Sequence, residues 1–400
     1  MKRSIYIMAL GAFGIITTEF GIIGIMPTIA REFDISIDTA GWLLSGFALT
    51  IALTGPFSVL LTSKFNRKWM MCWVLGIFVA SNILSAMANS FPVLMIARIL
   101  PAFLHPVFWA VASVAAARQV SPKDAPKAVA VVTGGLSVAT VLGVPLTTYV
   151  AELVNWRASL LLSGVINLGA FAALAAFVPS MPVKEKLSVK SQLKIFRNGQ
   201  LWVNLFATLI MIAGMFSTYG YMAEYLGKIS NMNGTQISLM LLLFGGAGIA
   251  GNWLTGVLLS KNVLLTTRVF LLALTGAHML AWAFGGYFGL MAGIIAIWGF
   301  IHTGGFLIGN TRTTGEAQEA PELAASLMVS FGNAGVTLGT FLGGLVITYY
   351  GIGQVVWLSA GLLLVTLGMT FIFIPKREAV PQPVEENIEL EFEEESVLGI

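Results

Sequence analysis

The charges of this sequence divide it into long uncharged stretches, and this feature limits the possible folds most strongly. A helix needs about 20 apolar residues to cross a bilayer, where an open backbone finds no hydrogen-bond partners. Seven uncharged intervals are long enough for one such helix and two are long enough for a pair: 39–63, 69–97, 99–117, 128–151, 158–183, 198–223 and 229–260, then 269–311 and 323–375. Residues 4–30, interrupted only by Glu19, add one more. We therefore predict twelve membrane-spanning helices.

The composition excludes a water-soluble protein. Only 10% of the residues are charged, against roughly 25% in an average soluble domain, and the mean hydropathy is +0.86. The single Cys72 and three scattered histidines form no metal-ligand pattern. Because no nucleophile with an oriented base is apparent either, we expect no enzyme activity, no cofactor or metal, and no nucleic-acid partner.

The distribution of Lys and Arg predicts the orientation of the chain in the membrane. These residues are retained on the cytoplasmic side. With the N-terminus inside, all of them fall on that side except Arg31, Arg157 and Lys228 outside and Arg98 within a span. We therefore expect both termini to be cytoplasmic.

Two sets of six helices are predicted, separated by the longest cytoplasmic connection. We place the first half at 1–179, a basic linker at 180–199, the second half at 200–376 and an acidic, disordered cytoplasmic tail at 377–400. The linker is either an amphipathic segment on the membrane surface or a solvated connection.

Short repeats suggest that the two halves are duplicates. Phe103-Leu104-His105 recurs 197 residues later as Phe300-Ile301-His302, and the small residues Gly135, Ala139 and Gly143 recur 200 residues later as Gly335, Gly339 and Gly343. Parallel repeats related by an axis along the membrane normal occur in one large class of transporters. The predicted fold class is thus all-α and integral to the membrane, with a pseudo-two-fold along the membrane normal.

Several motifs, over residues 4–376, resemble the major facilitator superfamily, in particular its bacterial twelve-helix drug:proton antiporter branch with arabinose, sugar and purine-nucleoside efflux proteins. They are Thr18-Glu19-Phe20, Met26-Pro27-Thr28-Ile29-Ala30, Trp42-Leu43-Leu44, Gly55-Pro56, Lys64-Phe65-Asn66-Arg67-Lys68, Arg98 with His105, Gly143-Val144-Pro145-Leu146 and Trp156-Arg157. The sequence departs from the family pattern in three places. The loop after span two carries Val59, Ser63 and Asn66 instead of a glycine, an acidic residue and a second glycine, and Thr147 stands where another glycine is common. In span four, Pro101-Ala102 replaces the usual Gln-Gly pair after the arginine.

Glu19 is the candidate proton site, because an ionised side chain in the centre of a helix costs about 2.5 to 3.5 kcal/mol. A structural hydrogen bond or a permanent ion pair is the alternative. Arg98 lies at a comparable depth, so it is a candidate ion-pair partner, a ligand for substrate oxygens or a helix anchor.

His105, Trp109, Tyr219 and His302 are candidate substrate-binding residues. Imidazoles can bind a substrate or relay protons, and aromatic rings can stack on a ring-bearing solute or simply pack. We expect Gly143 and Pro145 to serve conformational gating or static close packing, and the resemblance adds Lys64 and Arg67 of the basic turn to the gating residues.

The resemblance implies alternating access, and we expect proton-coupled efflux of a small, neutral organic solute such as a sugar, nucleoside or drug across the bacterial inner membrane. A monomer is the family expectation, and its partners are the solute, protons and the lipid bilayer. An uncoupled facilitator or importer and a non-transporting receptor are the alternatives.

Overall fold

A computed structural model describes residues 2–62, 64–121, 124–182, 193–317 and 321–373 of the chain. All regular secondary structure within these residues is helical. Twelve of the described segments are long and apolar enough to cross a membrane. The predictions of an all-α fold and of twelve spans are thereby confirmed.

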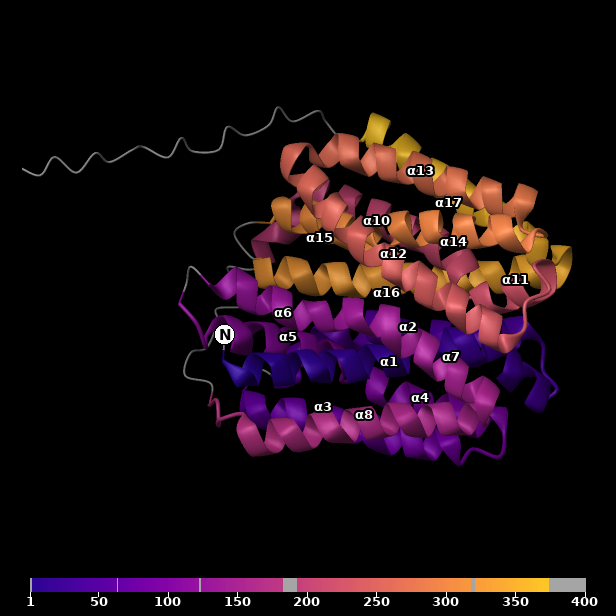
Figure 1. The fold of residues 1–400 in the computed structure, drawn as a ribbon. Coiled ribbons are helices and arrows are strands. Elements are labelled where there is room, and N and C mark those ends of the chain that lie inside the picture. Colours follow the sequence, from indigo (N-terminus) through magenta and orange to yellow (C-terminus); the bar gives the residue numbers. More distant parts are fainter. Residues whose placement is uncertain (1, 63, 122–123, 183–192, 318–320, 374–400) are drawn as a thin grey trace, which may run out of the picture.

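The described helices form two bodies that lie side by side, with their axes roughly parallel (Figure 1). The first body holds α1 (Arg3–Glu32), α2 (Ile37–Thr62), α3 (Arg67–Ala86), α4 (Phe91–Ala102), α5 (His105–Ala117), α6 (Ala125–Val138), the π-helical turn η1 (Ala139–Gly143), α7 (Val144–Leu153) and α8 (Trp156–Phe177). The second holds the 3-10 turn η2 (Leu193–Arg197), α10 (Gly199–Tyr219), α11 (Met222–Ile229), α12 (Gly234–Lys261), α13 (Val263–Phe284), α14 (Phe288–His302), α15 (Gly304–Gly315), α16 (Pro321–Tyr350), the 3-10 turn η3 (Ile352–Gln354) and α17 (Val355–Ile372).

Two of the predicted segments are described only in part or not at all. Within the linker predicted at 180–199, residues 183–192 lie outside the described residues, and so does the tail predicted at 377–400. The amphipathic and the solvated forms of the linker both remain predictions.

The fourth and tenth spans are each broken in the middle. In the fourth span, α4 ends at Ala102 and α5 begins at His105. Pro101 and Pro106 flank this break, and a proline inside a helix removes a donor and clashes with the preceding turn. In the tenth span the break falls at Thr303, whose hydroxyl donates to the carbonyl of Gly248 at 2.7 Å. Both breaks therefore lie next to a histidine of the repeat, His105 or His302.

The small-residue repeat marks equivalent helix contacts in the two bodies. A Cβ atom built on Gly135 or on Gly143 would meet Ala9 or Thr17 of α1. A Cβ built on Gly335 or Gly343 of α16 would meet Leu209 or Ser217 of α10. Both pairs of contacts are related by the same offset of 200 residues as the glycines themselves. Helix α10 thus stands in the second body where α1 stands in the first.

Contacts between the two bodies run along two helix pairs, α2 with α16 and α7 with α12. On the first pair, Thr337 Oγ1 donates to the carbonyl of Ser45 at 3.2 Å. On the second, Ser238 Oγ donates to the carbonyl of Pro145 at 2.8 Å. Between them, the rings of Phe20 on α1 and Phe216 on α10 lie 5.6 Å apart. Helices α1 and α10 thus also contact each other between the two bodies.

Candidate functional site

Glu19 lies in the interior of α1 and is buried, with 3% of its surface exposed. Its Oε2 atom is 3.0 Å from Nε2 of His105, the first residue of α5. The rings of Phe47 and Phe78 pack on the imidazole, with centroids 6.1 and 6.4 Å away. The break in the fourth span thus places His105 next to Glu19, the one carboxylate that the sequence analysis placed well inside a span.

Trp109 also contacts the Nε2 atom of His105. Its Nε1 atom donates a hydrogen bond to Nε2 at 3.2 Å. An indole N–H can only donate, so Nε2 carries no proton while it accepts this bond. A protonated Glu19 can donate to the same atom, whose single lone pair is then shared by the two donors. When Glu19 is ionised, Nε2 must carry a proton to bond it, and Trp109 loses its acceptor. The shared proton can therefore lie on Glu19 or on Nε2 of His105, and Trp109 keeps its acceptor only in the first case.

Arg98 contacts Glu19 through the backbone of α1. Its Nη2 atom donates to the carbonyl oxygens of Thr18 and Glu19 at 3.2 and 3.3 Å, and its Nε atom donates to the carbonyl of Leu43 at 3.5 Å. The guanidinium lies 5.8 Å from the Phe47 ring centroid. Arg98 thus joins α4 to α1 and α2 at the depth of Glu19, while the carboxylate itself points to His105.

Two buried asparagines that the sequence analysis did not single out fix α1 beside this site. Asn82 of α3 and Asn167 of α8 each donate from Nδ2 to Thr18 Oγ1 at 3.0 Å, and Asn167 also donates to the carbonyl of Gly14 at 3.0 Å. Amides within apolar spans were the available signal, since a buried amide needs hydrogen-bond partners. They hold the residue that precedes Glu19.

In the second body, Tyr219 and His302 form the counterpart of Glu19 and His105. The offset of 200 residues that relates α10 to α1 places Tyr219 at the position of Glu19. His302, the repeat mate of His105, has its ring centroid 4.9 Å from that of Tyr219. Phe216 and Phe244 complete an aromatic cluster around His302, at 5.9 and 5.3 Å. The pseudo-symmetry thus pairs a carboxyl-histidine site with a phenol-histidine site.

The basic turn between α2 and α3 is fastened to the end of α8. Asn66 Nδ2 donates to Ser180 Oγ at 2.7 Å, the backbone N–H of Met181 donates to Asn66 Oδ1, and Arg67 N–H donates to the Met181 carbonyl. Lys64 is exposed on this turn. Ser63, one of the departures from the family motif, lies outside the described residues. The Asn66 amide and the Arg67 backbone therefore join this turn to the residues that follow α8, and the gating roles of Lys64 and Arg67 remain predictions.

Span five contacts α1 closely around its own irregularity. The turn η1 is π-helical and immediately precedes Val144 and Pro145, as expected where a proline disturbs the ladder of backbone hydrogen bonds. Thr147, the second departure from the family pattern, lies against Gly21 of α1, so here the glycine is on the partner helix. A Cβ atom built on Gly143 would lie 2.2 Å from Thr17 Oγ1, two residues before Glu19.

We expect Gly143→Ala to lower the transport rate roughly tenfold, since overpacking costs about 1–3 kcal/mol. The added methyl group would push on Thr17 and hinder movement of span five along α1. Gly134→Ala is the matched control in the same span, because a Cβ at Gly134 meets no atom within 4 Å. Initial rates of solute flux in proteoliposomes measure the effect, and equal rates for the two variants would exclude this gating role.

Among the described residues, no group of three or more His, Cys, Asp or Glu side chains could hold a metal ion. Two bodies with six candidate membrane spans each, and a buried polar site around Glu19 and His105 in the first, are an arrangement typical of a membrane transporter. The family model of the Major Facilitator Superfamily matches residues 8–320. The chain belongs to this superfamily, whose members move small molecules across membranes.

Several proteins similar to this chain are named as transporters. The inner membrane transport protein YdhP of Escherichia coli (strain K12) is 32% identical over 93% of this chain and 95% of its own length. A "Probable sugar efflux transporter" of Helicobacter pylori (strain G27) is 29% identical over 91% of this chain and 93% of its own length. A crystal structure of a bacterial homologue of the human lysosomal transporter Spinster, inward-facing and unoccupied, superposes with a TM-score of 0.69 at 14% identity. That alignment covers 93% of this chain and 97% of the other. These matches confirm the predicted family and fold and establish a multi-pass membrane transporter.

Proposed function

We propose that the protein exports a small, neutral organic solute, such as a sugar, nucleoside or drug, in exchange for protons, by alternating access. The observation that supports this proposal is the buried contact between Glu19 and His105, because a carboxyl group and an imidazole in contact can together take up and release a proton. If substrate binding and protonation favour opposite conformations, the proton gradient drives export. The sugar efflux name of the Helicobacter relative supports the direction and the solute class.

In this proposal the two bodies supply different parts of the site. Glu19 and His105 handle the proton on the first body, with Arg98 fixing α1 beside them. Tyr219 and His302 on the second body provide aromatic and hydrogen-bonding surface for the solute, together with Trp109 on the first. The chain works as a monomer in the bacterial inner membrane, with both termini in the cytoplasm.

Counterflow from proteoliposomes tests the function directly. Vesicles preloaded with single pentoses, purine nucleosides or hydrophobic antibiotics are diluted into labelled solute, first without and then with an imposed pH gradient. We expect exchange of at least one solute and an accumulation that follows the pH gradient. Exchange without any response to the gradient would support the facilitator or importer, and binding without flux would support the receptor.

A separate experiment tests whether the positive charge of Arg98 acts on Glu19. Loss of the guanidinium removes a positive charge that favours the ionised carboxylate, so Arg98→Ala should move the pH optimum of transport upward. Glu19→Gln should abolish that shift in the double variant, since non-additivity identifies coupled residues. Arg98→Lys is the control that keeps the charge. The transport rate is measured from pH 5 to about 9. If Arg98→Ala leaves the pH optimum unchanged, Arg98 does not form an ion pair with Glu19 and is instead a substrate ligand or a helix anchor.

A further inference from the structure

A groove on the surface of the first body lies outside the site described above. It opens between the end of α2, the first three turns of α3 and the break between α4 and α5, and its volume is about 460 Å³. This volume lies within the range of about 300–1,000 Å³ that is typical of small-molecule sites. Leu104, which lies outside any helix at the break in the fourth span and directly precedes His105, is one of its lining residues.

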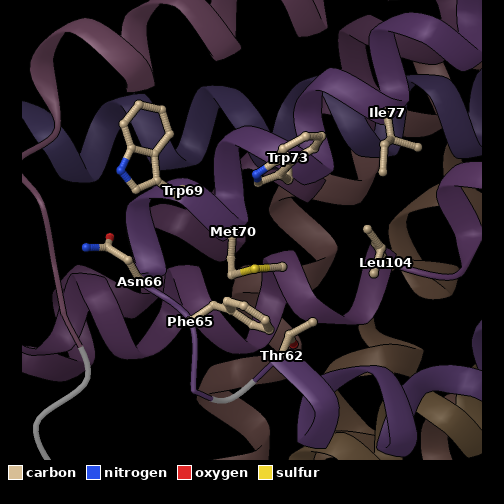
Figure 2. Close-up of a pocket in the computed structure, with 8 residues that line it drawn as sticks. All are labelled: Thr62, Phe65, Asn66, Trp69, Met70, Trp73, Ile77 and Leu104. Atoms are coloured by element: carbon tan, nitrogen blue, oxygen red, sulfur yellow. The ribbon is translucent and has the colours of Figure 1, made fainter.

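One side of the groove is a stripe of large apolar side chains on α3. Trp69, Trp73 and Ile77 follow one another at four-residue spacing, so they share one helix face. Figure 2 shows them in a row, with Phe65 and Leu104 across the open space. Trp69 and Trp73 remain 54% and 66% exposed. The groove therefore offers an apolar, aromatic lining to whatever lies outside the protein at this place.

The position of the groove on a membrane-spanning helix shows which molecules surround it. Segment α3 is a membrane span, and Trp69 and Trp73 fall in its first two turns, where aromatic side chains sit at the level of lipid headgroups. The neighbours of this surface are thus lipid molecules. An acyl chain is the apolar group that every lipid brings to it.

The charges at the end of the groove select one lipid class. Lys64 is exposed on the turn that leads into α3, and Lys68 Nζ lies 5.4 Å from the centroid of the Trp69 ring. None of the eight residues that line the groove is acidic. Basic residues beside a membrane span attract anionic headgroups, whereas a zwitterionic headgroup has no net charge to neutralise.

We propose that this groove is a binding site for an anionic phospholipid. One acyl chain lies along Trp69 and Trp73 toward Leu104, and the phosphate headgroup lies at Lys64 and Lys68. The proposal depends only on the membrane location of the chain, so it stands or falls independently of the proton coupling proposed above.

Tryptophan quenching by brominated lipids tests this site. The purified full chain is titrated in detergent micelles with brominated phosphatidylglycerol or brominated phosphatidylcholine. We expect phosphatidylglycerol to quench at lower concentration, by about fivefold for each lysine that contacts the headgroup. Salt at about 1 M should reduce this preference, since the Debye length is then only about 3 Å.

Three variants locate the effect. Trp69→Phe combined with Trp73→Phe should remove the quenching that distinguishes the two lipids, whereas Trp253→Phe should keep it, because Trp253 is 71% exposed but lies on α12. Lys64→Gln combined with Lys68→Gln should keep the quenching and abolish the preference. Equal quenching of the wild-type chain by both lipids would overturn the proposal. So would a preference that survives either the tryptophan pair or the lysine pair of substitutions.

Discussion

Glu19→Gln should continue to exchange solute across the membrane while losing all accumulation driven by a pH gradient. Glutamine has nearly the shape of a protonated glutamate, and its amide can still bond His105. It cannot release a proton, so the carboxyl group that shares a proton with His105 is lost. The change should therefore abolish coupling but leave the fold and the solute site in place.

Counterflow and pH-driven uptake, measured on the same batch of proteoliposomes, separate these two outcomes. Asp34→Asn is the matched control, because it removes an exposed carboxylate just after α1. The control should retain both activities. Wild-type accumulation by Glu19→Gln would refute the proton-site assignment, and loss of exchange as well would assign Glu19 to solute binding.

Gly251→Ala should destabilise the protein by about 3 kcal/mol or more, at the upper end of overpacking effects. A Cβ atom built on Gly251 of α12 would lie 1.6 Å from the carbonyl oxygen of Phe300 on α14. Gly299 makes the reciprocal approach, where a Cβ would lie 2.1 Å from the Phe244 carbonyl oxygen. Both clashes are with backbone atoms, so no side-chain rotation can relieve them. The two helices must therefore separate.

Gly246→Ala on the same helix is the matched control, since a Cβ there meets no atom within 4 Å. It should be neutral or slightly stabilising, because alanine is favoured over glycine in helices by roughly 1 kcal/mol. Thermal unfolding in detergent compares the two variants. A melting temperature of Gly251→Ala equal to that of Gly246→Ala would show that α12 and α14 are packed less closely than described.

The spans were predictable because the bilayer imposes one length on every apolar segment. Uncharged intervals located eleven of them and residues 4–30, with Glu19 as the one charge, gave the twelfth, while the repeat of Gly135 and Gly143 in α16 indicated which helices are equivalent. The breaks at Phe103 and Thr303 were not predicted. Pro101 and Pro106 were a visible signal for the first, and Gly304-Gly305 directly after Thr303 was one for the second.

The pairing of the site residues depended on geometry that sequence spacing does not contain. Depth along the helix predicted that Glu19 and Arg98 are neighbours, and the guanidinium does donate to the Glu19 carbonyl. Which way the carboxylate points is decided by the break that places His105 at the start of α5. Thr18 and its two asparagine donors were missed for a similar reason, because hydrogen bonds between distant spans leave no local pattern.

In the proton exchange proposed above, the replacement of the Glu19 carboxyl by the Tyr219 phenol at the equivalent position limits the energy available to one cycle. A phenol with an ordinary pKa of about 10 keeps its proton near neutral pH, so only the first of the two equivalent positions can release one. One proton that crosses a potential of about 100 mV delivers roughly 2.3 kcal/mol. That energy sustains about a 50-fold concentration ratio of a neutral solute. Under the proposed exchange, one proton per cycle would therefore limit the gradient of a neutral solute to this ratio.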